Sequence, residues 1–146
     1  MAVKAKTKEK TKTSVVSELE GMSLSVVIPA YNEEGAVKDT VRDVLDTLTP
    51  TGIPFEVIVV DDGSEDNTRE EAREAGATIE YNQVNSGYGA TLKRGVKSAQ
   101  YEYVAILDAD GTYPARYLPD MLAQCRDLDM VVGDRGAGMR NVPLIR

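Results

Sequence analysis

The sequence predicts an α/β fold in which a mostly parallel sheet carries helices on both faces. Short apolar runs rich in Val and Ile alternate along the chain with segments whose apolar residues recur at helical spacing. The run at residues 55–60 is almost purely apolar, which is typical of a strand covered on both faces. Alternating strand and helix units imply parallel strands, with ligands beyond their carboxyl ends.

The individual elements follow from local patterns, taken in chain order. Strands are expected at residues 24–28, 55–60, 78–81, 103–107 and 130–132. Helices are expected at residues 37–48, 69–75, 90–99 and 118–128. The first and last helices carry apolar residues at a spacing of three or four. Capping residues at 66–68 open the second helix and Gly76 ends it, while Pro114 and Pro119 mark the entry to the last one.

Length and composition favour one soluble domain in a reducing, cytoplasmic setting. The 146 residues suffice for a core but are few for an enzyme with two substrates, so a truncated chain is expected. No apolar stretch approaches the roughly 20 residues of a membrane span, and the polar N-terminus lacks the apolar centre of a signal peptide. The single Cys125 cannot form an internal disulfide.

Charge separates the first 22 residues from the rest. That segment holds five Lys and three Glu, although the whole chain has a net charge of −7, and we expect a disordered Lys-rich tail. A solubilising tail and a weak peripheral contact with the cytoplasmic face of a membrane both stay open. The acidic remainder disfavours nucleic acid as a partner. The absence of His excludes His-based zinc sites and Ser-His-Asp triads.

Polar residues gather after each of the first four expected strands, at residues 29–34, 61–64, 85–89 and 108–110. Each segment alone could be a turn or a helix cap. Because the carboxyl ends of parallel strands meet at one edge of a sheet, their coincidence predicts a ligand site.

Asp108 and Asp110 are the candidate metal ligands. Side chains two apart in extended backbone point to one side, so these carboxylates could share a hard cation. A lone Asp-x-Asp triplet usually marks a solvated turn, and it is the neighbouring polar segments that favour a metal site here.

Four segments together resemble the family 2 glycosyltransferases of the GT-A fold, which has a Rossmann-like, nucleotide-diphospho-sugar-binding sheet. They are residues 26–34, 59–68, 85–90 and 108–111, and the likeness spans about residues 23–135. Residues 85–90 and 132–135 are most similar to the dolichol-phosphate mannose synthase and polyprenyl-phosphate glycosyltransferase branch.

The resemblance implies nucleotide contacts for six residues: Pro29, Tyr31, Glu33, Asp61, Asp62 and Gly87. The first three would meet the base and ribose, and Asp61 or Asp62 would accept charge-assisted hydrogen bonds from them. Gly87 would let the backbone approach the ligand closely.

The resemblance also implies the catalytic residues. Asp108 and Asp110 would hold the Mg²⁺ or Mn²⁺ that bridges the donor diphosphate, and the guanidinium of Arg135 would clamp a phosphate. Members of the branch often carry Gln where this chain has Thr112, which puts a third protein contact to the metal in doubt.

The implied reaction is inverting transfer of a sugar from a GDP- or UDP-sugar to a polyprenyl or dolichyl phosphate at a membrane surface. Because the second pKa of a phosphate monoester is about 6, this nucleophile needs no strong base, whereas a sugar hydroxyl would need a carboxylate. A sugar-hydroxyl acceptor and a non-catalytic nucleotide-sugar-binding module stay open. Residues 23–135 would be the N-terminal part of the GT-A domain, and residues 136–146 the start of a missing acceptor-binding region. The short chain could then be inactive by itself.

Overall fold

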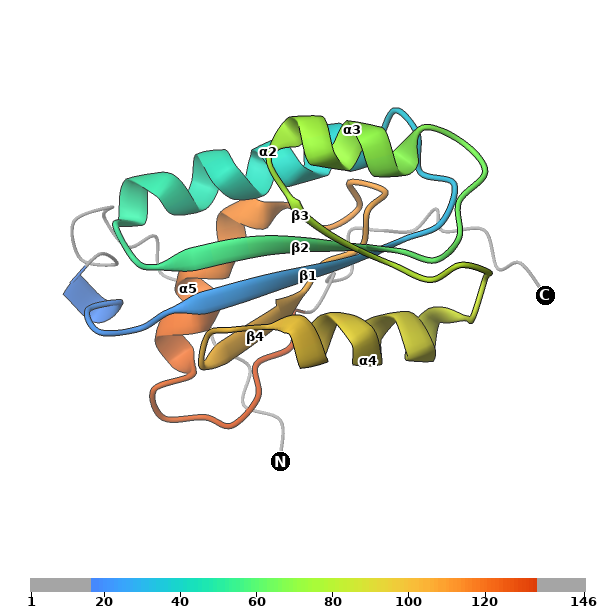
Figure 1. Cartoon of the computed structure of the whole chain (residues 1–146). Helices are drawn as coiled ribbons and strands as arrows, with labels where there is room; N and C mark the ends of the chain where they lie inside the picture. Colours follow the sequence, from blue (N-terminus) through green and yellow to red (C-terminus); the bar gives the residue numbers. More distant parts are fainter. Residues whose placement is uncertain (1–16, 134–146) are drawn as a thin grey trace, which may run out of the picture.

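The computed structural model describes residues 17–133, which form a four-stranded parallel sheet between two layers of helices (Figure 1). The strands are β1 (Leu24–Ala30), β2 (Phe55–Asp61), β3 (Thr78–Tyr81) and β4 (Tyr103–Ile106). Their order in the sheet is β3-β2-β1-β4, and all three pairings are parallel. The predicted α/β class is therefore confirmed.

The helices divide unequally between the two faces of the sheet. They are α2 (Val37–Leu48), α3 (Thr68–Ala75), α4 (Tyr88–Ser98) and α5 (Leu118–Gln124), with short 3-10 helices η1 (Thr49–Thr51) and η2 (Ala115–Tyr117). Of these four α-helices, α2, α3 and α5 lie on one face of the sheet and α4 lies on the other (Figure 1). The strands are parallel, so each must start at the same end of the sheet. The helix between two successive strands carries the chain back to that end.

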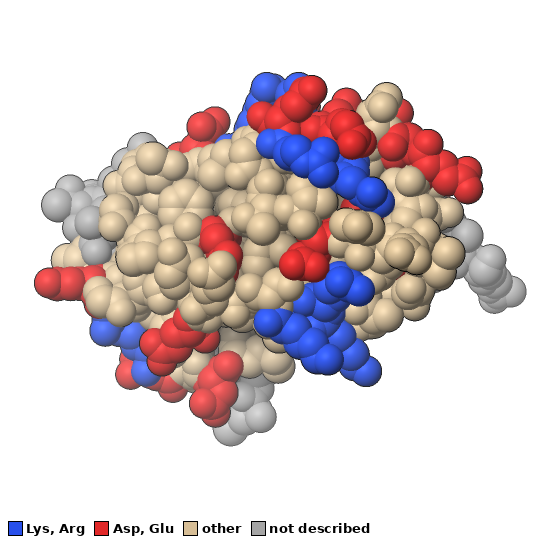
Figure 2. Space-filling view, viewed as in Figure 1, with Lys and Arg blue, Asp and Glu red and all other residues tan. Residues whose placement is uncertain are grey.

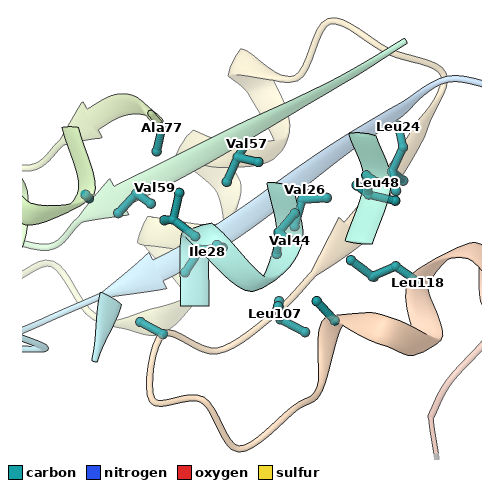
Figure 3. Packing of buried hydrophobic residues seen from close by; sticks show 14 of the residues in the cluster. Leu24, Val26, Ile28, Val44, Leu48, Val57, Val59, Ala77, Leu107 and Leu118 are labelled. Carbon is teal, nitrogen blue, oxygen red and sulfur yellow. The ribbon is translucent and has the colours of Figure 1, made fainter. Parts of the chain in front are cut away.

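Alternate residues of β1 build two separate cores. Val26 and Ile28 face the larger core, where they pack with Val44 and Leu48 of α2 (Figure 3). Val27 points the other way, into a smaller cluster beneath α4. All seven residues of β1 are buried, as expected for a central strand covered on both faces.

A glycine brings α4 close to the smaller core. A Cβ atom at Gly95 would lie 2.3 Å from Val27 Cγ1 and 2.9 Å from Val60 Cγ2, which is inside van der Waals contact. The absence of a side chain at this position therefore sets the distance between α4 and the sheet.

Several predicted element boundaries were wrong. Residues 130–132 form no strand, and Met130 and Val132 are 77% and 76% exposed. A strand needs a hydrogen-bonded neighbour, and no other strand within residues 17–133 pairs with this segment. Helix α5 ends at Gln124 instead of residue 128, β4 ends at Ile106 instead of Leu107, and α4 begins two residues earlier than predicted.

The packed part of the chain begins before residue 23. Leu19 is fully buried, Met22 is 3% exposed, and both belong to the larger core. Arg126 holds this segment by donating to the carbonyl oxygens of Glu18 and Glu20 at 2.7 and 2.5 Å. Residues 1–16, Arg135 and the predicted acceptor-region start at 136–146 lie outside the described residues. No helix formed by residues 17–133 has the length and apolarity needed to cross a membrane.

Candidate active site at the carboxyl edge of the sheet

The structure brings the four polar segments to one edge of the sheet. Ala30 at the end of β1 lies opposite Asp61 at the end of β2, which in turn lies opposite Tyr81 at the end of β3. On the other side of β1, Leu107 donates its backbone N–H to the Val27 carbonyl at 3.1 Å, which places the metal motif next to the same edge. Every predicted site residue within 17–133 therefore lies at or next to this edge.

The loop after β1 is tied to the loop after β2 by reciprocal hydrogen bonds. The backbone N–H of Asn32 donates to Ser64 Oγ at 2.9 Å, and the backbone N–H of Glu65 donates to Asn32 Oδ1 at 3.0 Å. Asn32 has a φ of 53°, a left-handed conformation that Asn tolerates better than most residues. Tyr31, the preceding residue, is 45% exposed, so its ring is available to a ligand.

The same loop is also held by side chains at the start of α3. The backbone N–H of Glu33 donates to Thr68 Oγ1 at 2.8 Å, and that of Glu34 donates to Asp66 Oδ2 at 3.1 Å. Asp66 in turn accepts the backbone N–H of Thr68 at 3.0 Å through Oδ1. Residues 31–34 are therefore held in one conformation before any ligand binds.

Asp61 is engaged by the protein itself. Its buried Oδ2 accepts Arg69 Nε at 2.9 Å and Arg69 Nη2 at 2.6 Å, and its Oδ1 accepts the backbone N–H of Ser64 at 3.0 Å. The Arg69 guanidinium also lies over the Tyr81 ring, 4.4 Å from its centroid. In this structure Asp61 therefore fixes the turn after β2, and a direct nucleotide contact by Asp61 stays a prediction.

Asp62 fixes the loop before α4. It is 4% exposed and accepts the side-chain N–H of Asn82 at 2.7 Å and the backbone N–H groups of Ser86 and Gly87 at 2.9 Å each. Burial alone would raise the pKa of Asp62, but the hydrogen bonds from Asn82, Ser86 and Gly87 outweigh it, so the pKa lies below its usual value. Asp62 is thus ionised and oriented toward the loop that contains Gly87.

The loops after β2 and β3 touch directly. A Cβ atom at Gly63 would lie 2.9 Å from the backbone nitrogen of Asn85, and Gly63 has a φ of +79°. Only glycine meets both conditions without a shift of the neighbouring loop. Gly63 therefore lets the loop after β2 come close enough for Asp62 to hold residues 85–87.

The metal motif lies just beyond β4 and not within it. Asp108 follows the strand by two residues, and Ala109 and Asp110 form a turn. The buried Ala109 anchors this turn, because Thr40 Oγ1 of α2 donates to its carbonyl oxygen at 2.9 Å. Asp108 and Asp110 were predicted to point to one side because they would lie in extended backbone. That reason was wrong, since a turn sets the direction of Asp110.

Negative charge accumulates where the turn faces the loop after β1. Burial raises the pKa of Glu33, and the charges of Asp110, Asp66 and Asp108 raise it further. Glu33 thus lies within electrostatic reach of both carboxylates of the metal motif. A divalent cation at the motif would relieve this repulsion, which supports the choice of Asp108 and Asp110 as its ligands.

The donor atoms fit a hard cation that keeps part of its water shell. Within residues 17–133 no three His, Cys, Asp or Glu side chains are placed to hold a metal ion together. Two carboxylates, completed by water and by substrate phosphate oxygens, are the usual set for Mg²⁺. Thr112 donates its backbone N–H to Asp110 Oδ1 at 2.9 Å, so it helps to orient the carboxylate.

Cavity size alone does not identify the site. A cavity of about 410 Å³ lies beside Asp110 and is lined also by Asp39, Asp43 and Tyr113. A larger one, of about 620 Å³, lies at the opposite end of the sheet against Leu19 and neighbouring residues. The polar side chains converge at the first end, and we assign the site there.

The faces of the molecule differ in charge. Helix α4 carries Lys93, Arg94 and Lys97 and no acidic residue, and Figure 2 shows Lys and Arg side chains gathered over it. Arg94 donates to Asn82 Oδ1 at 2.8 Å and pairs with Glu80 at 3.4 Å. The basic surface thus begins beside the loop that Asp62 holds.

Tyr88 is a site residue that the motifs of the sequence did not indicate. Its hydroxyl donates to Asp108 Oδ1 at 3.3 Å. Partial burial, and then the charge of Asp108, raise the pKa of Tyr88 above its usual value. The interpretation of residues 85–90 had rested on their glycines. The one available signal was a large side chain between Gly87 and Gly89.

A parallel sheet with carboxylates and glycine-containing loops at its carboxyl edge is typical of α/β domains that bind a ligand, often a nucleotide, at that edge. The sequence model of one protein family, Glycosyl transferase family 2, matches residues 25–145. The chain therefore belongs to glycosyltransferase family 2, as the resemblance predicted.

Two archaeal relatives point to the predicted branch. The chain is 40% identical over 113 residues to a dolichyl-phosphate hexose transferase of Haloferax volcanii, covering 77% of this chain and 47% of the relative. It is 29% identical over 133 residues to a dolichol-phosphate mannosyltransferase of Pyrococcus furiosus, covering 86% and 37%. The chain thus spans less than half the length of either relative.

Solved structures of GT-A enzymes share the fold. One is glucosyl-3-phosphoglycerate synthase from Mycobacterium tuberculosis in complex with Mn²⁺, uridine diphosphate and glucosyl-3-phosphoglycerate. It superposes with a TM-score of 0.65 at 27% identity, over 84% of this chain and 46% of that protein. The predicted GT-A fold is therefore confirmed, and the chain corresponds to less than half of that enzyme.

Proposed function

We propose that this chain is the donor-binding part of an inverting glycosyltransferase that transfers a hexose from a GDP- or UDP-sugar to a polyprenyl or dolichyl phosphate. The observation that carries the proposal is the convergence of the loop that contains Glu33 and the turn that contains Asp108 and Asp110 at one edge of the sheet, beside the loop held by Asp62. The relatives named for transfer to dolichyl phosphate support the acceptor. The enzyme crystallised with Mn²⁺ and uridine diphosphate supports a metal-dependent nucleotide donor.

The nucleotide would be received by loops that are already ordered. Tyr31 and Glu33 lie on the loop that Ser64 and Thr68 hold in place, and Pro29 is a buried residue of β1 just before that loop. A site fixed before binding loses little conformational entropy when the ligand arrives. Tyr31 offers an exposed ring to the base. We assign the hydrogen bonds to the ribose and base to the loop after β1.

Asp61 and Asp62 contribute in different ways. Asp61 is buried in its pair with Arg69 and stabilises the turn, so its part in binding would be to support Ser64. Asp62 holds Gly87 directly and lies next to the ligand-facing loop. Of the two, we place Asp62 nearer the nucleotide.

Asp108 and Asp110 would hold Mg²⁺ or Mn²⁺, which when bound supplies positive charge to the leaving nucleoside diphosphate. The protein's part is to hold the two carboxylates in place. Thr40 fixes the backbone of Ala109 between them, and Thr112 holds one oxygen of Asp110.

A lipid phosphate would need no protein base, because it is largely ionised near neutral pH, its second pKa being about 6. Its oxygen would attack the anomeric carbon in line with the departing diphosphate, which inverts the configuration. Arg135, the proposed phosphate clamp, lies outside the described residues. The basic side chains of α4, next to the site, support an anionic acceptor.

Calorimetric titration of the 146-residue chain with UDP and with GDP, each with and without Mn²⁺, tests the donor site. We expect one of the nucleotides to bind more tightly when Mn²⁺ is present. Folded protein that binds neither nucleotide would contradict the proposal.

The acceptor is tested separately. A form of the protein that extends past residue 146 into the acceptor-binding region is incubated with the matching nucleotide-hexose and with dolichyl phosphate, dolichol or a free sugar, and the glycosylated product is measured. Transfer to dolichyl phosphate alone is expected. Nucleotide binding without transfer to any of these acceptors would favour a non-catalytic module, and transfer to the free sugar would favour the other acceptor class.

A further inference from the structure

Tyr88 connects the loop before α4 to the first carboxylate of the metal motif. Its hydroxyl donates to Asp108 Oδ1 at 3.3 Å. The residues before it are fixed from the other side, because the backbone N–H groups of Ser86 and Gly87 donate to Asp62 at 2.9 Å each. Residues 86–88 therefore span the edge of the sheet, from the end of β2 to the turn after β4, across the end of β1.

We propose that Tyr88 is a positioning residue that orients Asp108 toward the divalent cation and couples cation binding to the nucleotide loop. The inference rests on the proposed function, since it takes Asp108 as a metal ligand. A neutral phenol has a single O–H donor, so it can fix one carboxylate oxygen and leave the other to bind the ion. A charged donor at the same place would compete with the cation, whereas a phenol would not.

The surroundings of Tyr88 favour a role in binding over a role in packing. The side chain is 58% exposed, so it adds little to the core. The glycines on either side leave open space, since a Cβ atom at Gly87 or Gly89 would meet no atom within 4 Å. The backbone on either side of Tyr88 is therefore open to an approaching ligand.

At 3.3 Å the contact between Tyr88 and Asp108 is longer than the usual O–H···O hydrogen bond of about 2.5–3.0 Å, so it directs the carboxylate without holding it tightly. Removal of a group that holds a metal ligand typically costs about 10–100-fold in metal affinity or activity.

The test compares the full chain with Tyr88→Phe, which keeps the ring and removes only the hydroxyl. The dissociation constants of UDP and GDP are measured by calorimetry with and without Mn²⁺, and their ratio gives the enhancement due to the metal. We expect the enhancement to fall about tenfold, while the metal-free dissociation constant and the urea midpoint stay unchanged. Tyr101→Phe is the matched control, because Tyr101 lies before β4, at the opposite end of the sheet.

The outcomes separate the inference from the proposed function. Full enhancement in Tyr88→Phe would overturn the positioning role and leave the metal site standing. An equal loss of metal-free and metal-dependent affinity would also overturn it, because the hydroxyl would then act on the loop and not on the metal ligand. If Mn²⁺ does not enhance binding to the wild-type chain, the proposed metal site fails, and the role of Tyr88 fails with it.

Discussion

The ion pair between Asp61 and Arg69 should be the main electrostatic support of the site edge, and Arg69→Ala removes one partner. Asp61 is fully buried, and the two Arg69 nitrogens lie 2.9 and 2.6 Å from its Oδ2. After Arg69→Ala, the Ser64 N–H would be the hydrogen-bond donor that remains to Asp61 among the contacts described above. Breaking a buried pair from one side costs about 3–5 kcal/mol.

The expected cost is lower here because water can reach one partner. The Arg69 side chain is 30% exposed, so solvent would enter its place and hydrate part of the carboxylate. Loss of the stacking on Tyr81, worth about 0.5–1 kcal/mol at an exposed site, acts in the other direction. We therefore expect Arg69→Ala to lower the free energy of unfolding by about 2–3 kcal/mol.

Urea denaturation followed by circular dichroism measures this loss. With an m value of about 1–3 kcal/mol per M, the midpoint should fall by roughly 1 M or more. Arg73→Ala is the control, since Arg73 lies on the same helix and pairs with Glu70 between side chains that are 57% and 60% exposed. Exposed pairs contribute about 0–1 kcal/mol. An Arg69→Ala midpoint equal to that of Arg73→Ala would refute the reasoning.

Three further predictions concern the metal motif, the Asp62 network and the packing of α4. Asp110→Asn should abolish the Mn²⁺-dependent part of nucleotide binding in calorimetry and leave the urea midpoint intact; unchanged Mn²⁺ dependence would exclude Asp110 as a ligand. The lowered pKa of Asp62 means that its stabilising effect is present above the unfolded-state pKa of about 4 and is lost as pH falls through the folded-state value. Asp62→Asn should therefore flatten the loss of stability in urea melts below about pH 4, and a slope equal to wild type would contradict the network. Gly95→Ala should cost about 1–3 kcal/mol because its Cβ would collide with Val27, whereas Gly89→Ala on the same helix, with open space around its Cβ, should not.

The elements that could be predicted from the sequence are those with a self-contained signal. Residues 55–60 are apolar except for Glu56, and they form a strand whose residues from Val57 onward are buried. Gly76 ends α3 in a left-handed conformation, with a φ of +106°, as a glycine after a helix commonly does. In both cases the local sequence is sufficient to specify the element, without reference to distant contacts.

The errors occur where the outcome depends on a distant partner. Residues 130–132 have strand-like composition, but a strand needs a neighbour to pair with. Leu19 and Met22 lie in a Lys-rich stretch whose composition suggested disorder, yet the core has room for both. Local composition does not show whether a partner exists, and so these segments could not be placed from the sequence.

The same distinction between local signals and distant partners applies to single side chains of the site. Motif spacing indicated that Asp61 and Asp62 belong at the site, but Asp61 ends β2 and Asp62 directly follows it, and successive side chains of extended backbone point to opposite faces of the sheet. Asp61 consequently meets Arg69 on the α3 face, and Asp62 meets Asn82 and Gly87 on the α4 face. One acidic pair thus holds two different loops, which explains why both positions carry a carboxylate even if only one of them touches the nucleotide. The position of Tyr88 opposite Asp108 arises in turn from the loop that Asp62 fixes, so it could be seen only after the sheet had been assembled.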